Sequence, residues 1–211
     1  MSAVFLDLDG TLMDSEPGIL SSLRAAFTET GHADIAAQDL KWMIGPPFID
    51  SFTKLGVPDP HSVIDAYRQV YDMGGMFDAT VYDGVFPMMD DLDLAGHRLY
   101  LATAKPHIAA TKITAHFGIA ERMVAEFGPE LDGTRNWKGD LLAYALDKTG
   151  ERAETSVMVG DRHHDFAAAA SVGMKCVAVR WGYGSEDEWQ AADAVISHPS
   201  ELAGAIAMLG L

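Results

Sequence analysis

Two carboxylates stand close together near the start of the chain, in the sequence FLDLDGT at residues 5–11. Asp7 and Asp9 are two residues apart, at the end of an apolar run typical of a strand that is covered on both faces. Burying an unpaired carboxylate in such a place is costly. The pair therefore predicts that compensating groups from elsewhere in the chain meet these two side chains.

Other polar residues follow later apolar runs in the same way. Thr103 ends the run HRLYLAT, Asp161 ends TSVMVGD, and Asp165 comes four residues after Asp161. In a parallel sheet the ligand site lies beyond the carboxyl ends of the strands, so these groups are expected to meet Asp7 and Asp9. Converging carboxylates repel one another unless a hard cation lies among them, and a site built of oxygen ligands is typical of Mg²⁺.

Groups suited to a bound phosphate lie in the same segments. A hydroxyl stands at the end of the second run, and backbone amides lie in the turn directly after the two acids. Of the two nearby lysines, we favour Lys138, which precedes the third run, over Lys105. A nucleophilic carboxylate, an acid–base partner, a cation and an anion-binding turn together indicate phosphoryl transfer. The expected phosphate contacts are Gly10, Thr11, Thr103, Ala104 and Lys138.

The segments that must position these groups alternate between two patterns. Short apolar runs predict strands, and apolar residues at three- and four-residue spacing predict helices. This alternation is typical of βαβ units, so we predict an α/β fold with a Rossmann-like parallel sheet and helices on both faces. The predicted strands are 3–9, 97–103, 155–161, 174–180 and 192–197, and the predicted helices are 105–118, 137–150, 165–173 and 199–209.

The stretch from about 16 to 82 breaks this alternation. It holds several segments of helical period separated by Gly or Pro, and no convincing strand. We interpret residues 16–82 as an all-helical cap domain inserted into an α/β core made of residues 1–15 and 83–211. The expected hinges are Asp14–Ser15 and Asp83–Gly84.

The composition argues against several functional classes. Of the 211 residues 48% are hydrophobic, enough for a buried core. The formal net charge is −16, and such a surface repels phosphate backbones, so no nucleic-acid partner is expected. There is no signal-peptide pattern, no apolar run near the roughly 20 residues that cross a membrane, and a single cysteine, Cys176, within an apolar run. We expect a cytoplasmic monomer or homodimer without a membrane partner.

Four segments together resemble the motifs of the haloacid dehalogenase superfamily. DLDGT at 7–11 matches the first motif, Thr103 the second, Lys138 the third and GDRHHD at 160–165 the fourth. They occur in the family's order and cover nearly the whole chain. The resemblance implies a Mg²⁺-dependent phosphatase in which Thr103 and Lys138 hold the phosphoryl oxygens. The helical insert is similar to the cap of the family's phosphoglycolate-phosphatase-like branch.

The same resemblance implies a role for each carboxylate. Asp7 is expected to be the nucleophile and also a metal ligand. Asp9 is expected to protonate the leaving oxygen, then to deprotonate the attacking water, and to ligate the metal through its backbone carbonyl. Asp161 would be a metal ligand, and Asp165 either a ligand or a support behind one.

Finer similarities concern the substrate. KWMIGPPF at 41–48 resembles a cap loop that approaches the active site in such phosphatases, so substrate contacts are expected from Gly45, Pro46, Pro47 and Phe48. ELDGTRNWKGDLL at 130–142 and GYGSEDEW at 182–189 resemble members known either as phosphoglycolate phosphatases or as 5′-nucleotidases. The expected substrate is therefore a small phosphorylated metabolite, 2-phosphoglycolate or a nucleoside 5′-monophosphate.

Alternatives stay open at this point. A phosphomutase of the beta-phosphoglucomutase type keeps both acids and a similar cap, and a non-catalytic binding protein could use the same fold. A dehalogenase is disfavoured because such enzymes lack an acid at the position of Asp9. His163 and His164 lie between acids, but hard carboxylates dominate there, so we interpret both as solvated and expect no transition-metal site.

Overall fold

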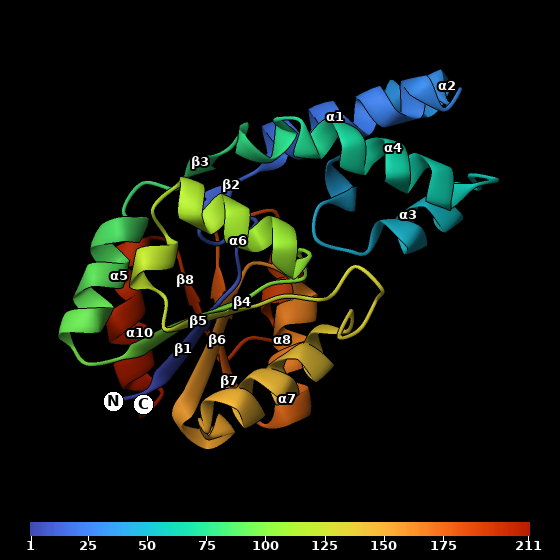
Figure 1. The fold of residues 1–211 in the computed structure, drawn as a ribbon. Helices are drawn as coiled ribbons and strands as arrows, with labels where there is room; N and C mark the ends of the chain where they lie inside the picture. Colours follow the sequence, from blue (N-terminus) through green and yellow to red (C-terminus); the bar gives the residue numbers. More distant parts are fainter. The chain divides into compact units, whose positions relative to one another are not determined.

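The computed structural model describes residues 1–211 and contains two compact units (Figure 1). One consists of Met1–Met13 and Val81–Leu211, and the other of Asp14–Thr80. The chain passes from one unit to the other within β2 (Met13–Asp14) and returns within β3 (Thr80–Val81), and these two strands pair with each other. Neither was predicted, because a strand of two residues has no periodicity to detect.

The first unit is built on a six-stranded sheet in which every strand is parallel to its neighbours, in the order β5-β4-β1-β6-β7-β8. All residues of β1 and β6 are buried, because central strands of a sheet covered on both faces carry apolar side chains on both sides. The bounds are β1 Ala3–Leu6, β4 Arg98–Ala102, β5 Ala125–Phe127, β6 Ser156–Gly160, β7 Lys175–Val179 and β8 Ala194–Ile196.

The predicted α/β class is confirmed, with two differences in detail. β5 was not predicted, because it is a three-residue strand at the edge of the sheet and two of its residues are only half-buried. β1 ends at Leu6, so Asp7 and Asp9 lie in the loop after the strand and not within it. The two acids are therefore held by a turn, while the strand fixes where that turn begins.

Helices cover both faces of this sheet (Figure 1). On one face α7 packs on β4, and α8 packs on β6 and β7. On the other, α5 packs on β4, and α10 packs on β8 and on α5. The bounds are α5 Val85–Leu94, α6 His107–His116, α7 Lys138–Thr149, α8 His163–Val172, α9 Glu186–Trp189 and α10 Leu202–Met208, with 3₁₀ turns at Ala120–Arg122, Ala153–Thr155 and Pro199–Glu201.

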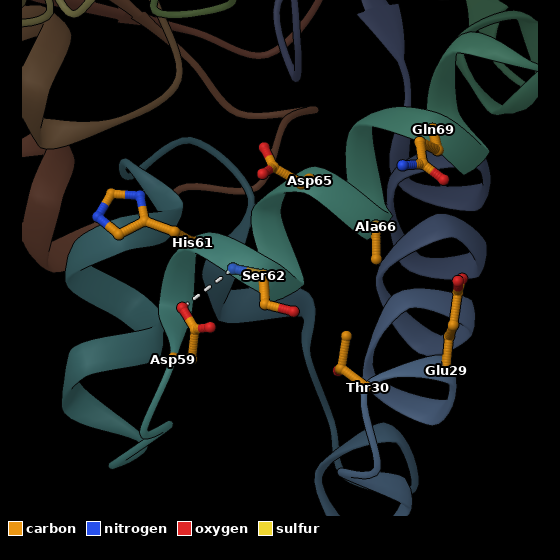
Figure 2. Close-up of a pocket in the computed structure, with 8 residues that line it drawn as sticks. All are labelled: Glu29, Thr30, Asp59, His61, Ser62, Asp65, Ala66 and Gln69. Carbon is orange, nitrogen blue, oxygen red and sulfur yellow. Dashed lines mark hydrogen bonds between the residues drawn. The ribbon is translucent and has the colours of Figure 1, made fainter.

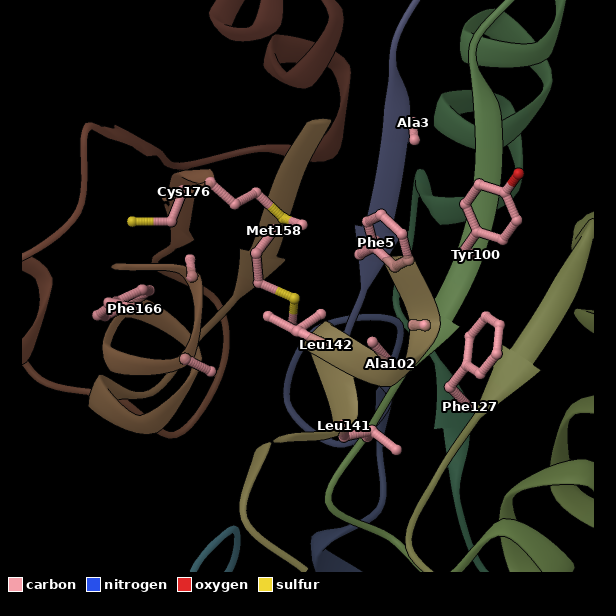
Figure 3. Packing of buried hydrophobic residues seen from close by; sticks show 14 of the residues in the cluster. Ala3, Phe5, Tyr100, Ala102, Phe127, Leu141, Leu142, Met158, Phe166 and Cys176 are labelled. Atoms are coloured by element: carbon pink, nitrogen blue, oxygen red, sulfur yellow. The ribbon is translucent and has the colours of Figure 1, made fainter. Parts of the chain in front are cut away.

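A hydrophobic cluster fills the space between the sheet and the helices α7 and α8 (Figure 3). Phe5 stacks on Tyr100 with ring centroids 5.0 Å apart. Met158 of β6, Cys176 of β7 and Phe166 of α8 belong to the same buried cluster. Because protein interiors are close-packed, this cluster holds the strands, and with them the loops at their carboxyl ends, in fixed positions.

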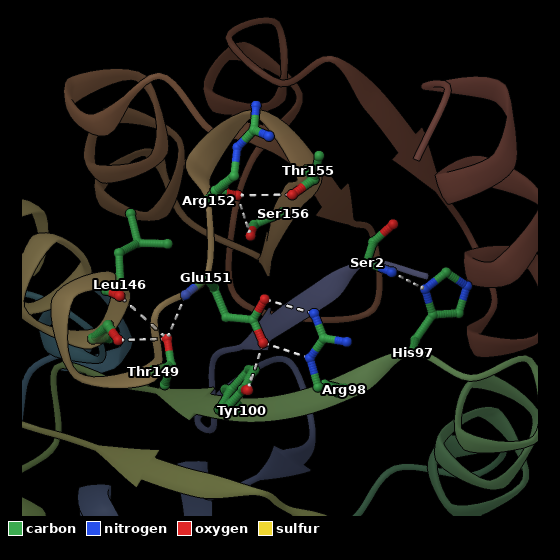
Figure 4. Close-up of polar contacts among 11 residues, drawn as sticks. Ser2, His97, Arg98, Tyr100, Leu146, Thr149, Glu151, Arg152, Thr155 and Ser156 are labelled. Atoms are coloured by element: carbon green, nitrogen blue, oxygen red, sulfur yellow. Dashed lines mark hydrogen bonds and ion pairs between the residues drawn. The ribbon is translucent and has the colours of Figure 1, made fainter.

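Polar contacts secure the opposite, amino-terminal edge of the sheet (Figure 4). Arg98, the first residue of β4, forms a bidentate ion pair with Glu151, which follows α7, with distances of 2.5 Å from Nε and 2.6 Å from the terminal nitrogen. The Tyr100 hydroxyl donates to the same carboxylate at 2.7 Å. The hydrogen bond from Arg98 outweighs burial and lowers the pKa of Glu151. This contact ties the end of α7 to the sheet.

The second unit is mainly helical. α1 packs on α2 and on α4, and α3 packs on α4. Phe52 contacts Phe27 and Phe48 in its interior, with centroid distances of 5.0 and 5.6 Å. The helices are α1 Glu16–Glu29, α2 Ala33–Ala36, α3 Phe48–Lys54 and α4 Pro60–Asp72, with 3₁₀ turns at Lys41–Met43 and Gly75–Phe77.

An open hollow lies between α1 and α4 within this unit (Figure 2). Its volume is about 590 Å³, and polar side chains such as Glu29, Asp65 and Gln69 line it. Asp59 at its edge accepts a hydrogen bond from the Ser62 amide and thereby caps the start of α4. The acidic side chains that line this hollow are exposed, and the hydrogen bond of Asp59 serves to cap α4.

Candidate active site

Three loops of the first unit meet because of the strand order. β1 lies between β4 and β6, so the loops that leave their carboxyl ends are neighbours. The loop after β1 carries Asp7 and Asp9, the loop after β4 carries Thr103 and Lys105, and β6 is followed directly by Asp161. From β1 the chain continues to β4 on one side, and from β6 it continues to β7 on the other, so the strand order reverses between β1 and β6, which is where ligands bind in open α/β sheets.

Lys138 joins two of the predicted carboxylates. It is the first residue of α7, and its ammonium lies 2.8 Å from Asp7 Oδ1 and also contacts Asp165 Oδ1. The three side chains are at most 7% exposed. Burial alone would lower the pKa of Lys138, but the charges of Asp165 and Asp7 outweigh it and raise the pKa. The lysine is therefore a fixed cation.

The two carboxylates respond to this environment in opposite directions. Burial, offset only in part by Lys138, raises the pKa of Asp7 to about 6. Burial also acts on Asp165, but there the charge of Lys138 prevails and lowers the pKa. Asp165 further accepts a hydrogen bond from the Arg162 amide at 3.1 Å, which caps α8. Both carboxylate oxygens of Asp165 thus have a partner, Lys138 for one and the Arg162 amide for the other. Ionised Asp7, in contrast, needs more positive charge nearby to offset its burial.

Asp161 is fully buried and only half satisfied. Its Oδ2 accepts a hydrogen bond from the Tyr183 amide at 2.6 Å, while Oδ1 has no hydrogen-bond partner. Burial, together with the charges of Asp165 and Asp7, raises the pKa of Asp161 well above its ordinary value. A buried oxygen without a partner beside other carboxylates fits a divalent cation, because hard cations take oxygen ligands.

Asp9 pairs with the second lysine. Lys105 Nζ lies 3.1 Å from Asp9 Oδ2, and the two side chains are 6% and 15% exposed. Sequence reasoning considered Lys105 only as a competitor of Lys138. The structure gives each lysine a different carboxylate, so the site contains four carboxylates and two ammonium groups. The negative charges outnumber the positive ones, so a divalent cation would offset the excess and allow a phosphate to bind.

The groups expected to bind phosphate divide into two sets. Thr103 is 1% exposed and its hydroxyl oxygen accepts the Lys105 amide at 3.2 Å, which leaves the hydroxyl hydrogen to donate elsewhere. No hydrogen bond within the protein uses the Ala104 amide. The amides expected from Gly10 and Thr11, in contrast, already donate to Met13 and Leu8 carbonyls at 2.9 and 3.3 Å.

Both amides are therefore used within the turn, and the role of Gly10 and Thr11 in phosphate binding stays a prediction. Gly10 has a φ of +81°, and its left-handed conformation closes the tight turn that consumes both amides. A methyl group on Gly10 would also collide with the Asp161 carboxylate. The glycine serves the site by allowing this close approach, which a sequence motif does not reveal.

The structure corrects the interpretation of one histidine. His163 is exposed and lies 2.5 Å from Glu188 through Nδ1. His164 is half-buried, and one of its ring nitrogens lies within 4.8 Å of carboxylate oxygens of Asp7 and Asp165. Burial is the main cause that lowers the pKa of His164 to about 4. These three side chains have the spacing of a metal site, and Lys138 contacts both of the carboxylates.

Four predicted substrate contacts belong to the helical unit. Gly45, Pro46 and Pro47 connect the 3₁₀ turn Lys41–Met43 to α3, and Phe48 begins α3. Phe48 packs against Tyr67 with centroids 4.7 Å apart, and all four residues are half-buried. Their role in substrate recognition stays a prediction.

Comparison with known proteins identifies the family to which the chain belongs. A family model described as haloacid dehalogenase-like hydrolase matches residues 4–179, most of the chain. The chain belongs to the haloacid dehalogenase-like hydrolase family. The predicted family is thereby confirmed.

Relatives of this haloacid dehalogenase-like hydrolase carry several names. A 5′-nucleotidase of Pseudomonas aeruginosa is 37% identical over 89% of this chain and 86% of its own length. A phosphoglycolate phosphatase of Xanthomonas campestris is 31% identical over 95% and 94%. The tyrosine-protein kinase PtkA of Mycobacterium tuberculosis is 41% identical over 87% of this chain, which spans only 64% of that protein.

A solved structure described as a predicted phosphatase from Clostridium acetobutylicum superposes with a TM-score of 0.91, 32% identity and 98% coverage of both chains. Together with the names of the relatives, this identifies the haloacid dehalogenase-like hydrolase as a phosphatase, as the sequence predicted. None of its helices is long and apolar enough to cross a membrane.

Proposed function

We propose that the chain is a Mg²⁺-dependent phosphomonoesterase that hydrolyses a small phosphorylated metabolite through an aspartyl-phosphate intermediate. The observation that carries the proposal is the buried group around Lys138, in which Lys138 offsets the burial of Asp7 only in part and Asp161 Oδ1 has no hydrogen-bond partner. Asp7, Asp161 and the Asp9 carbonyl would hold Mg²⁺. The metal would neutralise negative charge on the carboxylates and the phosphoryl group.

In the first step, an Asp7 carboxylate oxygen attacks phosphorus and the bond from phosphorus to the leaving oxygen breaks. Asp9 gives its proton to that oxygen, which departs as an alcohol. Lys138 stays within ion-pair distance of Asp7 and holds the carboxylate in place. The Thr103 hydroxyl and the Ala104 amide donate to the phosphoryl oxygens, whose charge they stabilise.

In the second step, Asp9 takes a proton from water as the water oxygen attacks phosphorus. The bond between phosphorus and Asp7 breaks, and inorganic phosphate and the free Asp7 carboxylate are released. Lys105 is 3.1 Å from Asp9 and keeps that side chain in one orientation through both steps. A binding-only site would have no use for a second acid beside Asp7.

For the substrate, two relatives support 2-phosphoglycolate or a nucleoside 5′-monophosphate, since they are named for these activities. The helical unit, residues 14–80, would act as the cap that selects the leaving group and excludes water, with Gly45–Phe48 in contact with the substrate. We propose that the protein binds only such metabolites, and neither nucleic acid nor membranes. We further propose that it is a cytoplasmic monomer or homodimer.

The test is release of inorganic phosphate from 2-phosphoglycolate, nucleoside 5′-monophosphates and sugar phosphates, with Mg²⁺ and with a chelator. We expect release from one class, abolished by the chelator and absent in Asp7→Asn. Conversion of one sugar phosphate into its isomer without phosphate release would indicate a phosphomutase. Absence of any reaction in the folded, Mg²⁺-supplied protein would favour a binding protein on this fold and contradict the proposal.

A second candidate is phosphoryl transfer to a protein tyrosine, favoured by the identity to the kinase PtkA. The solved structure of PtkA superposes with a TM-score of 0.83 and 37% identity. Incubation with radiolabelled ATP and a tyrosine-containing peptide tests it. Label on tyrosine that is lost in Asp7→Asn would support this candidate, whereas label appearing only as inorganic phosphate would support the hydrolase.

A further inference from the structure

The segment that follows β7, residues 181–189, touches both acid-bearing loops of the site. The Trp181 indole nitrogen donates to the Thr11 carbonyl at 3.0 Å, in the turn after Asp7 and Asp9. The Tyr183 amide donates to Asp161 Oδ2 at 2.6 Å, and the Trp189 indole nitrogen donates to the Asp161 carbonyl at 3.1 Å. Two of these three hydrogen bonds hold a single residue, Asp161.

Two glycines allow this segment to lie directly against Asp161. A methyl group on Gly182 would lie 2.6 Å from Asp161 Oδ2 and would also collide with the Gly10 carbonyl. A methyl group on Gly184 would collide with the Asp161 carbonyl and lie 2.7 Å from the Trp189 indole nitrogen. Neither position has space for a side chain, so the backbone itself forms one wall around Asp161.

Glu188 fastens the same segment to the residues directly after Asp161. Its Oε1 lies 3.2 Å from Arg162 Nε and 2.5 Å from His163 Nδ1, while Oε2 accepts the Ser185 amide at 3.0 Å. The first two contacts bind the start of α8, and the third closes the turn that begins α9. Segment 181–189 therefore contacts Asp161 and also the two residues that follow it.

We propose that segment 181–189 positions Asp161 for the metal, with Trp189 and Glu188 as its positioning residues. The Tyr183 amide occupies Oδ2 and leaves Oδ1, which has no hydrogen-bond partner, as the oxygen that would bind the cation. Trp189 and Glu188 hold the backbone on which this carboxylate stands. This inference rests on the proposed function, because it assigns the orientation of one ligand of the proposed Mg²⁺ site.

Partners behind a metal ligand fix its orientation, and their loss typically weakens metal binding by about 10-fold or more. We therefore expect Trp189→Phe, which keeps the ring but removes the indole donor, to weaken binding of Mn²⁺, used as a spectroscopic substitute for Mg²⁺, by about 10-fold. Mn²⁺ binding is measured directly by electron paramagnetic resonance, without substrate. The matched control is Trp137→Phe, since Trp137 is 67% exposed.

Two further pairs of variants make the test independent of one substitution. Glu188→Gln should weaken Mn²⁺ binding, whereas Glu186→Gln should not, because the Glu186 side chain is 81% exposed. Gly182→Ala should weaken it most, whereas Gly204→Ala, where a methyl group meets open space, should not. Circular dichroism and thermal unfolding confirm the fold, and if Gly182→Ala does not fold, the other two pairs decide.

Activity provides a second readout that a purely structural role would not change. In Trp189→Phe the Mg²⁺ concentration for half-maximal phosphate release should rise about 10-fold, while kcat at saturating Mg²⁺ approaches that of Trp137→Phe. Equal Mn²⁺ affinity in Trp189→Phe and Trp137→Phe would overturn the inference and leave the phosphatase proposal intact. Failure of the unmodified protein to bind Mn²⁺ or Mg²⁺ would overturn both.

Discussion

The ammonium group of Lys105 lies 3.1 Å from Asp9 Oδ2 in a pair that is almost entirely shielded from water. Lys138, the lysine of the third motif, contacts Asp7 and Asp165 instead. Asp7, the proposed nucleophile, and Asp9, the proposed acid–base residue, thus each pair with a different lysine, Lys138 at the start of α7 and Lys105 after β4. The first two predictions test the separate roles of these two lysines.

Lys105→Met should lower kcat for phosphate release by about 10- to 100-fold, because Asp9 loses the group that orients it. KM should change less, since Asp9 acts on the leaving oxygen and on water. Steady-state kinetics measure both constants. Lys112→Met, which alters an exposed lysine of α6, is the control. Equal kcat values for the two variants would show that Asp9 is oriented without Lys105.

Lys138→Met should lower phosphate release by about 100- to 1,000-fold, because a buried cation at the phosphoryl site is lost. It should also lower the free energy of unfolding by about 3–5 kcal/mol, since the buried Asp7 and Asp165 lose their shared partner. Urea unfolding followed by circular dichroism measures the second effect. Stability like that of Lys112→Met would mean that the pair of carboxylates is compensated in another way.

Asp7→Asn should abolish phosphate release while the protein keeps its fold, because the amide is a poor nucleophile of nearly the same shape. Rapid quenching after addition of labelled substrate should trap phosphate on the unmodified protein and none on Asp7→Asn. Asp14→Asn, which changes a carboxylate in β2, is the control. Turnover by Asp7→Asn above about one thousandth of the normal rate would contradict the covalent mechanism.

Glu151 provides a prediction for the dependence of stability on pH. The hydrogen bond from Arg98 lowers its pKa from the ordinary value of 4.5, so the folded state favours the ionised form. The stability from this contact is therefore present above that value and is lost as the pH falls through the lowered pKa. Melting temperatures of the unmodified protein and Glu151→Gln should differ at about pH 7 and converge toward about pH 3.

The matched control for this pH series is Glu154→Gln, because Glu154 is 70% exposed and its pair with Arg152 is a surface contact. Its melting temperature should follow that of the unmodified protein throughout. A difference between Glu151→Gln and the unmodified protein that does not shrink on acidification would show that the carboxylate charge does not carry this contact.

Cys176 should resist thiol reagents in the folded protein. The side chain is 3% exposed, and burial raises the pKa of its thiol to about 11, so the reactive thiolate is scarce at neutral pH. A colorimetric disulfide reagent should react slowly with the native protein and rapidly in urea. Rapid reaction of the native protein would indicate that the cluster around α8 opens more readily than its packing implies.

The sequence alone determined the fold class and the chemical groups of the site. Apolar runs alternating with helical periods specify a parallel sheet, because central strands covered on both faces must be apolar throughout. Asp7, Asp161, Thr103 and Lys138 could be found because each stands beside a strand or helix end, where such a sheet collects its ligands. These features are local in sequence, and so local patterns reveal them.

The tertiary structure alone decided which of these groups meet and how they are held. The three-residue β5 is stabilised by its pairing with β4, not by a pattern of its own. The Gly10 and Thr11 amides are consumed by a turn whose geometry the motif does not show. The Trp189 indole meets the Asp161 carbonyl across 28 residues of sequence. Such contacts depend on distances in space between segments that are remote in the chain, and they form only when the packed sheet brings those segments together.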